Sequence, residues 1–350
     1  MKKKPGGQLR NSQLIVPLIA IMLIVLFNLI RDPSFFSIEV TANNEGNTVL
    51  AGNLISIFNG ASELAILAMG MTLVTAACGG QDISVGALAA IAGSVFVKVL
   101  KSGDTISVGT ILLGFLCCLV VAVIFGAFNG TLVAVFKIQP MIATLVLYTC
   151  GRSVAYWING GATPTVSSPL ITALGGFIPG IPIPTPILIV ALVAIVFFLI
   201  FRFTSLGIYT QSVGINQRAA NLNGINTVGM KLLTFMILGA CCSIAGIIAV
   251  SRLSLINHET VLLEIEMDAI LAVAIGGNAL SGGKFKMTGS VVGAYAIQAL
   301  TTTLYAMKVP STAIKAYKAI VIIIIVAIGS PVVKEKISRL AAKRRAKGVA

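Results

Sequence analysis

The side chains that can do chemistry are few, and the most distinctive ones lie in residues 78–86, with the sequence CGGQDISVG. Asp82 is the only carboxylate between Glu63 and Asp104, and long apolar runs flank the stretch on both sides. Paired glycines interrupt a helix because they accept backbone angles that other residues avoid. A carboxylate among apolar residues must face protein or water. The stretch therefore predicts a helix break inside a membrane, where Asp82 either caps the helix that restarts at Ile83 or binds a solute.

A second glycine motif lies in residues 276–283, with the sequence GGNALSGG. It repeats the spacing of the first: two glycines, three residues, a serine, one residue and a glycine. Two broken apolar segments of like design are typical of transporters built from two related halves, parallel or inverted. Asn129 ends another apolar run, as a helix cap or as a lining residue. We expect the translocation path or its gate at Gly79, Gly80, Asp82, Ser84, Asn129, Gly276, Gly277, Asn278 and Ser281.

The composition indicates a membrane protein. Hydrophobic residues make up 57% of the chain, charged residues 10%, and the mean hydropathy is +1.00, all far from soluble averages. The net charge of +14 is concentrated in residues 1–12 and 334–350. Basic tails beside membrane spans indicate cytoplasmic termini rather than nucleic-acid binding. The six cysteines lie in or beside apolar runs with a single histidine in the chain, so we expect no disulfide, metal or other cofactor.

The apolar runs predict one membrane domain over residues 1–350, an all-α polytopic fold with about ten spanning helices. Some are shorter than the roughly 20 residues that a straight crossing needs, as expected for broken helices. Glu63, at the start of the second run, is expected to be solvated or to cap its helix. The links 33–60 and 159–186 are expected outside, the second as turns and non-helical pieces. The runs cover residues 14–30, 61–78, 83–98, 106–128, 140–158, 187–203, 229–250, 268–280, 288–307 and 314–333.

Residues 204–227 form the longest polar link on the side of the basic tails. Gly214 and Asn216 predict a turn followed by an N-cap, and Gly224 predicts the end of a helix of about two turns. A short helix between two spans is a docking element. We therefore expect residues 204–227 to be a docking segment on the cytoplasmic side.

The link resembles the coupling loop of ABC-importer permeases, whose core of two alanines, three residues and a glycine matches Ala219, Ala220 and Gly224. Arg218 stands where an acidic residue is usual. Residues 79–86 resemble the Gly-Gly-Ile-Asp-Leu-Ser-Val-Gly signature of the ribose/galactose-type carbohydrate permeases, with two substitutions. The resemblance covers about residues 60 to 330. The chain also resembles galactofuranose-type members, and further matches to the family lie at residues 129–130, 137–140, 151–155, 213–216 and 268–277.

This resemblance implies a type II-importer-like ABC permease in a bacterial inner membrane, with both termini cytoplasmic. A second permease subunit, either a copy or a sister chain, would complete the path for a sugar. An extracytoplasmic sugar-binding protein would deliver that sugar. A cytoplasmic ATPase would hold ATP and magnesium, since this chain has no Gly-x-x-x-x-Gly-Lys-Ser/Thr loop. The residues implied for coupling to the ATPase are Asn216, Arg218, Ala219, Ala220 and Gly224.

Two other classes of membrane protein stay open at this point. An ion-coupled secondary transporter would also have broken repeats, although ion coupling usually needs more intramembrane carboxylates than Asp82. A membrane-embedded enzyme would need a nucleophile and a base, or a metal cluster, at workable spacing. His258, the one histidine, lies in a predicted outer link, which argues against the enzyme.

Overall fold

Helices form most of the chain because long apolar runs satisfy their backbone groups internally in a membrane. The computed structural model describes residues 15–42, 48–103 and 105–329, so the predicted basic tails 1–12 and 334–350 lie outside the described residues. The elements are α2 (Ile15–Arg31), η1 (Pro33–Phe36), β1 (Glu39–Ala42), β2 (Thr48–Ala51), α3 (Asn53–Gly60), α4 (Ser62–Cys78), α5 (Val85–Leu100), α6 (Val108–Ala134), α7 (Pro140–Ile158), α8 (Pro169–Gly175), α9 (Thr185–Phe203), α10 (Leu206–Ile215), α11 (Gln217–Leu222), α12 (Thr227–Leu253), α13 (Ile265–Ile275), α14 (Met287–Ala306) and α15 (Ser311–Gly329).

Each predicted apolar run overlaps a helix, which supports a polytopic membrane fold. The run 268–280 was predicted too long, because α13 ends at Ile275, and residues 330–333 of the last run lie outside the described residues. Within the described ranges, five helices are long and apolar enough to cross a bilayer: residues 53–78, 108–134, 140–158, 185–203 and 227–253. Residues 17–31 and 85–100 form shorter apolar helices. The short helix α13 has only 11 residues, fewer than a crossing needs, as expected beside a glycine break.

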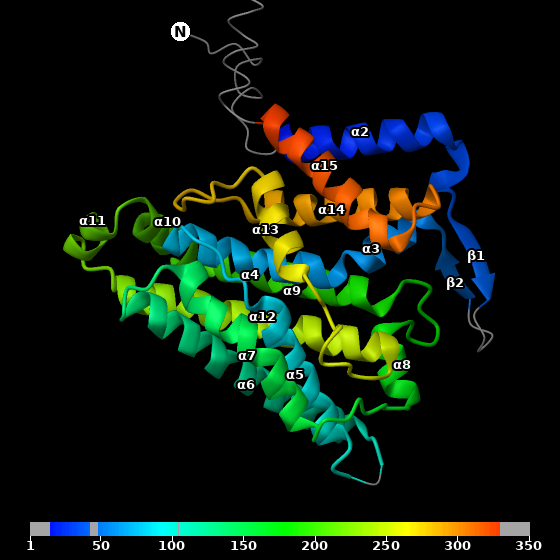
Figure 1. Cartoon of the computed structure of the whole chain (residues 1–350), viewed down its shortest axis with the longest axis horizontal. Helices are drawn as coiled ribbons and strands as arrows, with labels where there is room; N and C mark the ends of the chain where they lie inside the picture. Colours follow the sequence, from blue (N-terminus) through cyan, green and yellow to red (C-terminus); the bar gives the residue numbers. More distant parts are fainter. Residues whose placement is uncertain (1–14, 43–47, 104, 330–350) are drawn as a thin grey trace, which may run out of the picture.

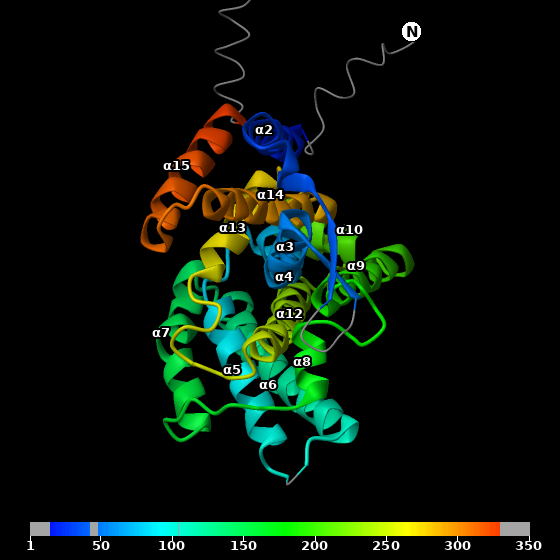
Figure 2. The ribbon, with the colours of Figure 1, turned by 90° about the vertical axis from the view of Figure 1, so that its right-hand side faces the viewer.

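Helix α4 is the centre of the bundle (Figure 2). Its side chains are buried on every side from Ser62 to Ala77, and it packs against α12, α13 and α14. Gly70 allows the close approach of α12, because a Cβ there would lie 2.8 Å from Cδ1 of Leu238. A helix that is hydrophobic all round is buried in this way.

The exposed faces of α2, α6 and α9 are apolar along the middle of each helix. On α6 they include Leu112, Leu116, Val120, Ile124 and Phe128, and α9 presents a comparable row of large apolar side chains. Hydrocarbon chains of lipid are the surroundings that such faces fit. These three helices therefore present lipid-facing surfaces.

The short helices α10 and α11 lie at one end of the bundle, and the strands β1 and β2 and helix α8 lie at the other (Figure 1). Helix α2 begins and helix α15 ends toward the α10–α11 end. The links and helix ends on that side carry the basic residues Lys137, Arg202, Arg218, Lys231, Lys284 and Lys286.

The links contain more regular structure than the sequence predicted. Strands β1 and β2 pair antiparallel, so the prediction of an all-α fold is wrong at this hairpin. The N–H of Leu50 in β2 donates to the carbonyl of Pro182 at 3.0 Å, which fixes the hairpin to the second outer link. That link also contains the helix α8, where non-helical pieces were expected, because Pro169 occupies the first turn, a position that suits proline.

Candidate functional site

The first glycine motif breaks the chain between α4 and α5, as predicted. Gly79 ends α4 in the left-handed conformation with φ of 63°, and its N–H donates to the carbonyl of Thr75. One oxygen of Asp82 accepts bonds from the Ser84 N–H at 2.7 Å and the Ser84 hydroxyl at 2.6 Å. Helix α5 begins only at Val85. This start is two residues beyond the predicted restart at Ile83, and the N-cap is Ser84 rather than Asp82. Asp82 therefore closes the turn that precedes the helix.

Asn129 of α6 joins this turn from across the bundle. Its side-chain amide donates to the Ser84 hydroxyl at 2.9 Å and lies 3.4 Å from the second oxygen of Asp82. All three side chains are buried, with Asp82 only 1% exposed. The fold thus brings together three residues that the sequence placed on the path or its gate. In this conformation they bond to one another rather than to a solute, and the network satisfies polar groups that the break exposes.

The second glycine motif turns the chain between α13 and α14. Gly277 has φ of 80°, and the side chain of the buried Asn278 bridges the turn. Its oxygen accepts from the Lys286 N–H at 2.7 Å, and its amide donates to the Ser290 hydroxyl at 2.8 Å. Thr72 of α4 donates to the same Ser290 hydroxyl at 2.6 Å. This break is therefore tied to the central helix, while Ser281 at the tip of the turn is exposed.

The two breaks lie directly against each other. A Cβ on Gly79 would lie 2.7 Å from the carbonyl oxygen of Ser281. The Gly283 N–H donates to the carbonyl of Ala76 at 2.9 Å, and the side-chain amide of Gln81 donates to the carbonyl of Leu280 at 3.1 Å. Backbone can approach backbone this closely only where side chains are absent. The missing side chains of these glycines therefore let the two breaks, residues 78–86 and 276–283, pack together. We call this packed pair of breaks the joint.

Gly80 is required for close packing rather than for an unusual backbone conformation. The sequence predicted that it needs backbone freedom, but the left-handed residue is Gly79. A Cβ on Gly80 would instead lie 2.8 Å from the ring of Pro140, the first residue of α7. We expect Gly80→Leu to destabilise the protein by about 1–3 kcal/mol through overpacking, measured as a lower melting temperature in detergent. Gly109→Leu is the control, because Gly109 has an ordinary φ and a Cβ there would meet only Ser107 Oγ at 3.7 Å; equal losses would contradict the packing argument.

Helix α11 carries the predicted coupling residues. Asn216 is its N-cap, since its side-chain oxygen accepts from the Ala219 N–H at 3.0 Å. Gly224 follows the helix with φ of 78° and open space around it. Ala220 is buried, whereas Asn216, Arg218, Ala219 and Gly224 are exposed. The predicted capped helix is confirmed, and Figure 1 shows it at the extreme end of the molecule.

Gly214 does not form the turn that the sequence predicted. It lies inside α10, which extends to Ile215. A Cβ on Gly214 would collide with the carbonyl oxygen of Ala76 and would lie 2.7 Å from the N–H nitrogen of Gly283. Ala76 belongs to α4 and Gly283 to the second break. Helix α10 is therefore seated on the end of α4 and on the second break. Helix α11 follows its far end.

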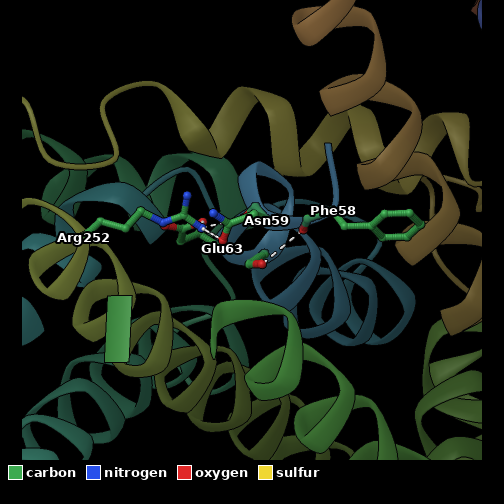
Figure 3. A network of polar contacts seen from close by, with 5 residues as sticks. Phe58, Asn59, Glu63 and Arg252 are labelled. Atoms are coloured by element: carbon green, nitrogen blue, oxygen red, sulfur yellow. Dashed lines mark hydrogen bonds and ion pairs between the residues drawn. The ribbon is translucent and has the colours of Figure 1, made fainter. Parts of the chain in front are cut away.

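The sequence also missed a buried ion pair at the opposite end of α4 (Figure 3). Nε of Arg252 lies 2.9 Å from one oxygen of Glu63, and Nη2 donates to the other oxygen at 3.1 Å. The same nitrogen donates to the side-chain oxygen of Asn59 at 3.1 Å. Glu63 was expected to be solvated or a cap, but its side chain is 8% exposed. No local pattern reveals this pair, because Arg252 is 189 residues away along the chain.

Comparison with known proteins identifies the kind of protein to which this joint belongs. Residues 53–328 match the family described as "Branched-chain amino acid transport system / permease component". The galactofuranose transporter permease of Escherichia coli is 38% identical to the chain, over 89% of this chain and 88% of that protein. The chain belongs to this family of transport permeases. The fructose import permease of Bifidobacterium longum is 33% identical to our permease over 98% of this chain and 95% of that protein.

The ribose import permease of Escherichia coli is 33% identical over 88% of this permease and 91% of its own length. These relatives confirm the resemblance to ribose/galactose-type carbohydrate permeases and do not favour an ion-coupled transporter. No solved structure matches the permease. The described part of the chain contains no group of three or more metal-ligating side chains.

Proposed function

We propose that this permease carries a monosaccharide across the inner membrane as one of two permease subunits in an ATP-driven importer. The sugars in the names of its relatives, galactofuranose, fructose and ribose, support the substrate class. The observation that carries the mechanism is the seating of α10, through Gly214, on the end of α4 at Ala76 and on the second break at Gly283. A force applied to α11 would reach the second break by direct contact and the first break through the end of α4.

In this proposal a cytoplasmic ATPase subunit docks on α11. Asn216, Arg218, Ala219 and Gly224 are exposed there, and Leu222 is 90% exposed. An open cleft of about 520 Å³ lies beside them, lined by residues that include Tyr209, Asn223 and Met230. An exposed leucine beside a cleft suits a protein partner. ATP and magnesium would be held by that partner.

The residues of the two breaks would act as the gate. Gly79 and Gly277 let the chain change direction through their positive φ, and Gly80 and Gly276 leave room for Pro140 and Gly289. The buried bonds of Asp82, Ser84, Asn129 and Asn278 hold the conformation seen here, and Ser281 lies at the contact between the breaks. Closure of the ATPase pair would move α10, and the joint would tip the bundle between its two openings. Related halves would place the two breaks at equivalent positions.

The assembly around the permease follows from the same proposal. A second permease, identical or homologous, forms the other wall of the path. A sugar-binding protein delivers cargo at the end with β1, β2 and α8, and both termini face the cytoplasm. The test is uptake by the complete system in liposomes. Sugar should accumulate only with ATP, and uptake driven by an ion gradient without ATP would overturn the proposal.

Docking on α11 is tested by Gly224→Trp. A large side chain there fills open space at the proposed interface, so we expect ATPase subunit retention during purification and sugar-stimulated ATP hydrolysis to fall at least severalfold while the permease still inserts. Gly180→Trp is the matched control, since Gly180 also has positive φ, 84°, and open space but lies in the outer link. Similar backbone strain is therefore introduced at both ends. Equal retention of the ATPase by both variants would remove α11 from the interface.

A further inference from the structure

The outer half of the face formed by α7, α13 and α15 carries exposed polar side chains beside the aromatic rings of Tyr156, Trp157 and Tyr317, whereas the inner half exposes apolar residues such as Val146 and Ile323. Figure 2 shows these three helices along one side of the bundle, away from α9. Several polar residues of this face lie well inside the helices. On α7 the exposed residues of the outer half include Thr149, Cys150 and Ser153, where α6 exposes Leu113 and Leu116.

Charged side chains occupy the same face. Nζ of Lys318 on α15 lies 2.6 Å from a carboxylate oxygen of Asp268 on α13, and Nζ of Lys315 lies 2.6 Å from Glu264. Lys318 follows the first residue of α15 by seven residues, which is a depth of about 10 Å. A charged side chain at such depth is costly in hydrocarbon. Both pairs are partly exposed, so this face requires water or a polar neighbour.

A third link joins α7 to the same region. Arg152 of α7 donates to the carbonyls of His258 at 2.9 Å and of Val261 at 3.1 Å, in the link that leads into α13. A Cβ on Gly86 of α5 would lie 3.4 Å from Nη2 of Arg152 and in close contact with Glu266 of α13. Glu266 is buried, and one of its oxygens has no hydrogen-bond partner in the described part of the chain. Polar groups are thus present on α7, on α13 and on α15.

We propose that the outer half of the water-filled path runs along this α7–α13–α15 face, and that its hydroxyl and charged groups contact the sugar. The inference rests on the proposed function and adds the location of the path and its lining residues. A neutral polyhydroxylated solute suits the face, because paired charges and hydroxyls offer both donors and acceptors without net attraction for an ion. The lining residues are Thr149, Cys150, Ser153, Asp268, Lys315 and Lys318.

Cys150 provides a test without any mutation. The reactive form of a cysteine is the thiolate, which forms in water and is suppressed in apolar surroundings. The complete importer in lipid nanodiscs is treated during ATP turnover with a charged methanethiosulfonate, and modified peptides are quantified by mass spectrometry. We expect Cys150 to react faster than Cys117, on the lipid-facing helix α6, by roughly tenfold or more. A Cys150 as unreactive as Cys117 would overturn the proposed path.

Two introduced cysteines at equal distance from the outer helix ends control for the exposure of the side chain. Ser153 lies five residues from the outer end of α7 at Ile158, and Leu113 lies five residues from the outer end of α6 at Val108. Ser153→Cys should react as fast as Cys150, and Leu113→Cys as slowly as Cys117, although Leu113 is 52% exposed. Equal reactivity of these two cysteines would also overturn the path.

Sugar supplied with its binding protein should slow the modification of Cys150. Undiminished modification would overturn the sugar contact while leaving the water-filled path in place. Because labelling requires only water, a reactive Cys150 in a complex that moves no sugar with ATP would overturn the proposed function and not the location of the path.

Discussion

Gly214→Ala is expected to uncouple the permease from its ATPase and to lower its stability by about 1–3 kcal/mol. The added methyl group meets the backbone of α4 at Ala76 and the backbone of the second break at Gly283, and neither can rotate away as a side chain can. Helix α10 must therefore shift off the joint. The measurements are the melting temperature in detergent and sugar-stimulated ATP hydrolysis in liposomes.

Gly207→Ala is the matched control for this variant. Gly207 lies in the same helix, and a Cβ there would meet only the ring of Phe201 at 3.3 Å. Alanine is favoured over glycine inside a helix by about 1 kcal/mol, so this variant should keep its coupling and its melting temperature. Normal coupling in Gly214→Ala would show that α10 does not drive the breaks.

Arg252→Ala is expected to lower the stability of the protein by about 3–5 kcal/mol. The reason is that Glu63, whose side chain is 8% exposed, would stay buried without its partner. Asn59 would lose a donor at the same time. The melting temperature in detergent and the yield of folded protein report the loss.

Two comparison variants show how much of the loss comes from leaving a buried charge unpaired. Lys315→Ala breaks an ion pair whose side chains are 65% and 49% exposed, and exposed pairs contribute about 0–1 kcal/mol. The double replacement Glu63→Met with Arg252→Met removes both charges together and should recover most of the stability. A double variant no more stable than Arg252→Ala would show that the lost packing, rather than the unpaired charge, causes the effect.

The order and approximate bounds of the membrane helices followed from the sequence because long apolar runs leave few alternatives to a helix in a bilayer. The short elements were less predictable. Gly214 was interpreted as a turn because glycine usually marks one, whereas here its missing side chain makes room for Ala76. Pro169 was interpreted as a loop residue, although proline also begins helices such as α8.

The candidate site was predictable where its signal was local. Asp82 and Ser84 belong to one turn, and Asn216 caps a helix that its own neighbours form. Contacts between distant segments have no such signal. Thr72 and Ser290 are 218 residues apart along the chain, and the meeting of Asn129 with Ser84 depends on how α6 crosses α5. Packing of whole helices decides those pairs, and a single sequence does not contain that information in readable form.

The complete enclosure of α4 has a consequence for biogenesis. Its neighbours α12, α13 and α14 begin only at Thr227, so a ribosome adding about 5–20 residues per second needs on the order of ten seconds to supply them after α4 has been made. During that interval Thr72 and Thr75 of a newly inserted α4 contact lipid or an insertion factor. A nascent chain arrested before Thr227 should therefore be a substrate for membrane quality control, because the helices α12, α13 and α14 that cover its central helix beside α9 and α10 are missing.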